Sequence, residues 1–223
     1  MLAPINSPTP IRPIGLVTPR MPQDICVGAP SCAALVQHEL LLAVHRQIPH
    51  AYDRAVRELG LTLAFTQELI DRRVEIVTAA RAIKLARLIA YEPNARDVFA
   101  EAGHNLFSSL IQEFPGLIKH SIRNLPRPMR VFFALSLTKR IAHSFAGSVN
   151  RIFVDRHQQG IALTVRNGVF SDRLDTLGCA YSYYRNIFET MFQQFAFVDC
   201  EVTEVRRSRV HLNQCNLEIV WEA

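Results

Sequence analysis

Three cysteines in the last third of the chain have the residue type that binds soft metal ions. Cys179 begins a helix-like segment, while Cys200 and Cys215 lie in two strand-like runs, so the ends of these elements could bring the thiols together. Thiolates in such an arrangement would favour zinc. However, the chain contains no Cys-x-x-Cys pair, and cysteine commonly packs as a small buried hydrophobe. We therefore expect these cysteines to line a ligand pocket, and we assign no metal site.

An imidazole, two phenols and a guanidinium complete the set of candidate ligand contacts. His143 lies close to Ala146-Gly147-Ser148, where small residues permit close approach, and a neutral imidazole can ligate the metal of a tetrapyrrole. Tyrosine offers a flat apolar face with a hydroxyl, and arginine can bind a carboxylate. The ordinary alternative for each is a core or solvated surface residue. The expected ligand-binding residues are His143, Cys179, Tyr181, Tyr184, Cys200, Cys215 and Arg130.

The elements that would position these residues can be predicted from apolar spacing. Helical spacing extends over 31–48, 51–59, about 66–92, 94–114 and 129–145, and again through Phe188 and Phe192. Strand-like alternation covers 150–157 and 161–169 around Gln158-Gln159-Gly160, then 198–205 and 215–221. The sequence thus predicts an α+β fold, in which a helical N-terminal layer packs on a small antiparallel sheet built from two hairpins.

The chain divides into an arm and one domain. Residues 1–30 contain seven of the twelve prolines, which disfavours regular helix and indicates a flexible or extended arm. We expect 31–223 to form a single α+β ligand-binding domain, in which 31–93 is helical and 94–223 is the part that resembles a known family.

Composition excludes several classes of function. The net charge of +5 is spread over 223 residues, so nucleic acid is not an expected partner. The chain shows no signal peptide and no apolar stretch of the roughly 20 residues that a membrane span needs. Five cysteines without a close pair favour a reduced, cytoplasmic location. Gly-x-Gly-x-x-Gly, His-Glu-x-x-His and Gly-x-Ser-x-Gly motifs are absent.

The order of several short motifs resembles the bacteriochlorophyll 4-vinyl reductase family. The resemblance covers roughly 95–222, and no single motif in it is specific. Its motifs are Ala102-Gly103, Leu125-Pro126, Phe145-Ala146-Gly147-Ser148, Cys179, Phe188-Glu189-x-x-Phe192, Val202-Thr203-Glu204, Cys215 and Ile219-x-Trp221. Members of that family are expected to carry one more cysteine, where this chain reads Arg206-Arg207-Ser208-Arg209.

The resemblance implies a role in (bacterio)chlorophyll biosynthesis, acting on divinyl Mg-tetrapyrroles. Vinyl reduction needs an electron donor, and NADPH would serve only if the protein is a true reductase. Because no cofactor motif is present, we expect binding and delivery of an Mg-tetrapyrrole to enzymes of chlorophyll synthesis, in the cytoplasm or at the periphery of the photosynthetic membrane. A homodimer is compatible with this role. The alternative is a small-molecule sensor or adaptor domain with no catalytic activity.

Overall fold

The computed structural model describes residues 32–72, 74, 76–112, 116–146, 151–157, 160–166, 178–194, 196–205 and 214–221. The proline-rich arm predicted for residues 1–30 lies outside this part of the chain. The elements, in order, are α1 (Cys32–Gln47), α2 (Pro49–Leu59), α3 (Leu63–Asp71), α4 (Ile76–Ile89), α5 (Ala95–Gln112), α6 (Gly116–Arg123), α7 (Arg127–Ala146), β1 (Arg151–His157), β2 (Gly160–Arg166), α8 (Cys179–Gln194), β3 (Cys200–Glu204) and β4 (Gln214–Trp221).

The N-terminal helices have local signals that explain where they begin and end. Pro49 opens α2, where its missing amide hydrogen costs nothing, and Gly60 closes it with φ 60°. Thr62 then caps α3 by accepting a hydrogen bond from the Phe65 amide at 3.0 Å. The helix predicted for 51–59 is therefore confirmed within two residues. The single helix predicted for 66–92 is wrong, because α3 ends at Asp71 and α4 starts at Ile76.

The four strands form one antiparallel sheet in the order β1-β2-β4-β3. β1 pairs with β2 and β3 pairs with β4, but β2 also pairs with β4 along its whole length, from Gly160 opposite Val220 to Arg166 opposite Gln214. The expected pair of hairpins is therefore fused into one continuous sheet. Alternate residues are buried on its inner face: Ile161, Leu163, Val165, Val202, Cys215, Leu217 and Ile219.

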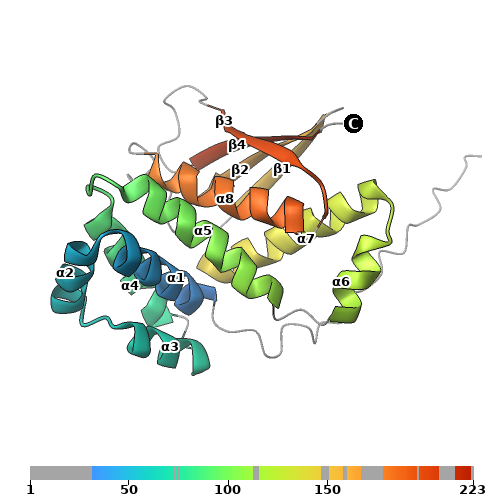
Figure 1. Ribbon diagram of the computed structural model, residues 1–223. Coiled ribbons are helices and arrows are strands. Elements are labelled where there is room, and N and C mark those ends of the chain that lie inside the picture. The colour runs from blue at the N-terminus through green and yellow to red at the C-terminus, as the bar shows by residue number, and fades with distance from the viewer. Residues whose placement is uncertain are drawn as a thin grey trace, which may run out of the picture.

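Helix α8 lies between the inner face of the sheet and α5, and the helical body continues beyond α5 to α1–α4 (Figure 1). The α5–α8 contact is very close. A Cβ atom on Gly103 of α5 would lie 2.3 Å from the Tyr183 carbonyl oxygen of α8. Only glycine fits at this position, which accounts for a helix-interior glycine that otherwise costs about 1 kcal/mol.

The expected architecture was wrong about where the helices belong. They do not form an N-terminal layer, since α5, α7 and α8 come from the middle and end of the chain: α5 and α7 pack with α1, and α8 packs on α5. The buried residues form one core that runs from Leu40 and Leu85 in the helices, through Phe99 and Phe188, to Leu217 in the sheet. The molecule is a helical body with a small sheet on one side.

Candidate functional site

The three C-terminal cysteines lie in different places. Cys200 of β3 is opposite Trp221, whereas Cys215 lies six residues earlier on β4. At about 3.3 Å per residue, these two cysteines are roughly 20 Å apart along the strand. Cys179 contacts the helical body, with its Sγ 4.0 Å from the Ala90 carbonyl oxygen. The hypothesis that the three thiols converge is therefore wrong, and the part of the chain that the structure describes holds no group of metal-binding side chains.

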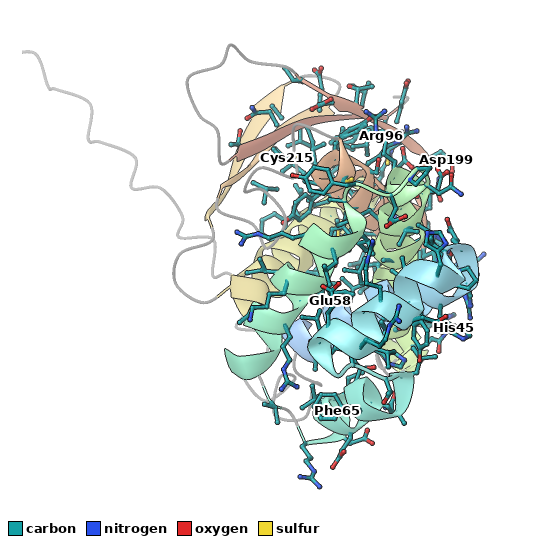
Figure 2. The ribbon with its side chains drawn as sticks, turned by 90° about the vertical axis from the view of Figure 1, so that its left-hand side faces the viewer. His45, Glu58, Phe65, Arg96, Asp199 and Cys215 are labelled. Atoms are coloured by element: carbon teal, nitrogen blue, oxygen red, sulfur yellow. The ribbon has the colours of Figure 1, made fainter. Side chains whose placement is uncertain are left out.

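The environments of Cys179 and Cys200 keep these two thiols protonated. Burial raises the pKa of Cys179, and the nearby positive charge of Arg96 lowers it by a smaller amount. Burial also raises the pKa of Cys200 to about 12, and the negative charges of Glu189 and Asp199 add to this shift. A thiolate is the nucleophilic and metal-binding form, so neither cysteine is activated for such chemistry. Figure 2 shows Cys215 on the sheet side of the molecule and His45 and Phe65 on the helical side.

Tyr181 and Tyr184, which we expected to contact a ligand, instead contact other residues of the protein. The Tyr181 hydroxyl donates a hydrogen bond of 3.1 Å to the Val202 carbonyl oxygen, which ties α8 to the edge strand β3. Burial raises the pKa of Tyr181, and Arg185 partly offsets this effect. Tyr184 is half-buried, and its ring packs edge-on against Tyr183 with 5.5 Å between centroids. Both tyrosines thus contribute to packing around α8.

Helix α7 carries the other two expected ligand contacts. Arg130 is half-buried, and its Nε atom is fully buried without a hydrogen-bond partner among the described residues. His143 belongs to the same helix, but its side chain lies outside the described part of the structure. An unpartnered guanidinium nitrogen is a donor that a ligand carboxylate or carbonyl could satisfy.

The most unusual polar group in the described structure is Gln37 of α1, which the sequence reasoning missed. Gln37 is 0% exposed, and both its Nε2 and Oε1 atoms lack hydrogen-bond partners. Such groups are rare in folded proteins, because each one costs about 1–3 kcal/mol. The buried face of this helix is centred on Gln37. A glutamine amid Ala33, Ala34, Leu40, Leu41 and Val44 was the available signal.

Other buried polar groups on and around α1 have partners. Glu39 is 6% exposed and accepts a hydrogen bond of 3.1 Å from the Ser109 hydroxyl of α5. His38 Nδ1 lies 2.8 Å from the Thr66 hydroxyl, which itself donates to the Leu63 carbonyl oxygen at 3.0 Å. His38 must therefore donate from Nδ1. Burial lowers the pKa of His38, although the negative charge of Glu39 opposes the shift. Helix α1 thus carries several polar side chains in an apolar setting.

Comparisons with known proteins give a likeness in structure alone. No family model matches the chain, and no curated protein matches it. An Ile-to-Phe mutant of the T. tengcongensis H-NOX is 12% identical with TM-score 0.57, over 86% of this chain and 97% of that one. An oxygen-binding H-NOX domain related to soluble guanylate cyclases is 12% identical with TM-score 0.54, over 83% and 92%. An H-NOX from work on heme distortion is 13% identical with TM-score 0.54, over 86% and 95%.

These comparisons correct the resemblance to the bacteriochlorophyll 4-vinyl reductase family, which is wrong. Three predictions that depended on this resemblance are also wrong: the Mg-tetrapyrrole partner, the role in chlorophyll synthesis and the oxidoreductase assignment. The motifs misled because they reflect packing. Phe188 and Phe192 are 2% and 0% exposed on α8, and any amphipathic helix shows that spacing. The assigned fold also changes: over most of its length, this chain has the fold of an H-NOX domain.

Proposed function

We propose that this chain is a small-molecule sensor domain with no catalytic activity of its own, acting in the cytoplasm. The observation that carries the proposal is the buried, unpartnered amide of Gln37. A buried amide lowers stability when its NH2 group has no acceptor and its oxygen has no donor. Proteins keep such groups where they serve a function. A ligand that offers an acceptor beside a donor, such as a primary amide or a protonated carboxylic acid, would satisfy both atoms of Gln37.

Heme is the first ligand to test against the residues, since work on similar H-NOX structures concerns heme. The described residues do not by themselves build a site for it. His38 is half-buried and His104 is exposed on α5. Both hold Nδ1 on a threonine hydroxyl, of Thr66 and Thr190 at 2.8 and 2.9 Å, which leaves Nε2 as the ring nitrogen that a metal could use. The other described histidine side chains, of His45, His50 and His120, are exposed. The tight contact of α5 on α8 at Gly103 also leaves no space between those helices for a macrocycle. Heme therefore has no part in the proposed function.

The position of α1 suits a sensing role. It packs against α2, α3, α4, α5 and α7, so a ligand at Gln37 would contact the helix that joins most of the helical body. Arg130 of α7 supplies a second buried donor without a partner, through its Nε atom. Ligand binding stabilises whichever arrangement of the helices satisfies the Gln37 amide, which is how a binding event shifts a conformational equilibrium.

Thermal unfolding of the wild type and of Gln37→Leu, with a panel of small amides and carboxylic acids bearing apolar tails, tests this function. We expect at least one compound to raise the Tm of the wild type and to leave that of Gln37→Leu unchanged. A ligand at a hundred times its Kd adds about 2.7 kcal/mol of stability. Gln67→Leu is the matched control, since Gln67 is exposed on α3 and binds Asp71; it should respond as the wild type does.

Two results would contradict the proposal. If every stabilising compound acted equally on the wild type and on Gln37→Leu, the ligand site would lie elsewhere. If hemin gave a stoichiometric complex with a shifted Soret band, the absence of a heme fit would be wrong, and the function would return to that of a heme domain.

A further inference from the structure

The described helices, none of which is long and apolar enough to cross a membrane, differ in how firmly they are held to the body. Helix α5 buries large side chains such as Phe99. Helix α2 has 11 residues and lies at the edge of the helical body (Figure 1), where it buries Ala51 and Ala55 and packs with the partly buried Tyr52 and Leu59. A helix of this length is marginal in water, and two buried methyl groups stabilise it little.

A cluster of three charged side chains holds α2 to the end of α4. Glu92, in the turn after α4, accepts hydrogen bonds from two α2 side chains that lie one turn apart. His50 donates from Nε2 to Oε2 at 3.0 Å, and the Arg54 guanidinium donates to Oε1. Arg54 also donates to the Leu88 carbonyl oxygen of α4 at 3.3 Å. His50, Arg54 and Glu92 are here termed the Glu92 cluster.

The closed position of α2 does not satisfy all of its polar groups. The Nε atom of Arg54 is buried there without a hydrogen-bond partner among the described residues, which lowers the stability of the closed position. The residues that flank α2 are firmly placed, since Ile48 and Leu61 are 3% and 0% exposed. Opening of α2 would therefore hydrate Arg54 and leave the core on both sides intact. Segments with few buried contacts open separately from the rest of a protein.

We propose that α2 is a local switch, which opens between the anchors Ile48 and Leu61 when Glu92 no longer holds His50 and Arg54, while the other helices stay folded. Because α2 packs on α1 and α4, opening uncovers the sides of these two helices that α2 covers. The switch is a property of the ligand-free fold and does not rest on the sensor function.

Acid should open the switch. The charged groups that act on Glu92 are His50 and Arg54, both from α2. Hydrogen bonds from His50 and then from Arg54 hold the pKa of Glu92 below its ordinary 4.5, although burial opposes this shift. The folded protein therefore binds fewer protons at Glu92 than the unfolded chain. The stabilisation by the cluster is complete above pH 4.5 and is lost as pH falls through the lowered pKa.

Hydrogen exchange of backbone amides tests the proposal. Glu92→Gln keeps the shape of the side chain and removes its charge. We expect the amides of 53–59 to exchange about tenfold faster in this variant, since two partly exposed ion pairs together contribute about that factor. The amides of 99–111 in α5 should exchange as they do in the wild type, because the opening is local.

Glu101→Gln is the matched control. Glu101 of α5 also accepts hydrogen bonds from two side chains of an earlier helix, Arg46 and Gln47 of α1. However, α1 is held by large buried side chains such as Leu40 and Leu41. The amides of 38–44 in α1 should therefore exchange at the wild-type rate in Glu101→Gln.

A second measurement follows the same amides into acid. Relative to an unstructured chain, exchange in α2 of the wild type should speed up below pH 4.5, and Glu92→Gln should lack this step. Unchanged exchange of α2 in Glu92→Gln would overturn the proposal, as would equal acceleration in α5 or an equal response of α1 to Glu101→Gln. These measurements involve neither Gln37 nor a ligand, so the switch and the sensor function fail separately.

Discussion

The α5–α8 contact and the surroundings of α1 are both buried, but they treat polar groups differently. Between α5 and α8, the His104 and Thr190 side chains satisfy each other at 2.9 Å, and Gly103 lets the two backbones touch. Around α1, the Gln37 amide has no hydrogen-bond partner, and Glu39 accepts a hydrogen bond from the Ser109 hydroxyl. The first contact has the form of a structural core, and the second that of a binding site kept at a cost in stability.

The largest expected effect follows from closing the α5–α8 contact. Gly103→Ala places a Cβ atom 2.3 Å from a backbone oxygen that cannot rotate away, so the helices must separate. We expect a loss of about 3 kcal/mol in the free energy of unfolding, measured by urea denaturation. Gly116→Ala is the control, because a Cβ there meets nothing within 4 Å. Equal stability of the two variants would show that the contact is not tight.

A substitution near α1 should act in the opposite direction. Gln37→Leu removes an amide that has no partner and retains the apolar volume, so the ligand-free protein should gain about 1–3 kcal/mol in unfolding free energy. The same denaturation experiment measures it. A variant less stable than the wild type would mean that the amide is paired in solution, and the contrast between the two regions would disappear.

A paired buried group beside α1 should behave like the α5–α8 contact. Thr66 is 0% exposed, and its hydroxyl bonds both the His38 ring and the Leu63 carbonyl oxygen. Thr66→Val keeps the shape but leaves His38 Nδ1 without its acceptor, so it should cost about 1 kcal/mol. If Thr66→Val stabilised the protein as much as Gln37→Leu, the burial of a polar group would by itself explain both changes in stability. The presence or absence of a hydrogen-bond partner would then make no difference.

The smallest effect should be a pH dependence that comes from His38. Its pKa lies below the ordinary 6.5, mainly because of burial. The folded protein therefore binds fewer protons at this site than the unfolded chain, and stability should fall as pH drops below 6.5. Comparing unfolding free energies of the wild type and His38→Gln between about pH 7 and pH 5 checks this. An unchanged slope in the variant would assign the pH dependence to other groups.

The local elements could be predicted from the sequence better than their assembly. Pro49 and Gly60 mark the ends of α2, and alternation marks β1 and β2. The break between α3 and α4 was missed because apolar spacing continues across it. The fold itself was assigned wrongly, since motifs such as Phe188 and Phe192 report burial on a helix and not the family of the protein.

The candidate site was missed for a related reason. Whether Cys200 and Cys215 meet depends on the register of β3 on β4, which no local pattern reveals. Gln37 could have been noticed as a polar residue within an apolar helix face, but its lack of a partner depends on helices distant in the sequence. Cysteine and histidine have side chains with recognisable metal-binding and acid–base chemistry, whereas a glutamine amide in a sequence gives no such signal.

The strand order also has a consequence for how the chain acquires its structure. β4 lies between β2 and β3, although it follows both in the sequence. The four-stranded sheet therefore cannot be completed during synthesis until residues 214–221 have left the ribosome, while the β1–β2 pair and the local contacts of α1–α4 can form much earlier. Contacts between distant segments form slowly. We expect the helices of the nascent chain to fold before the sheet is complete. During this interval the apolar inner faces of β2 and α8 would be exposed and available to chaperones.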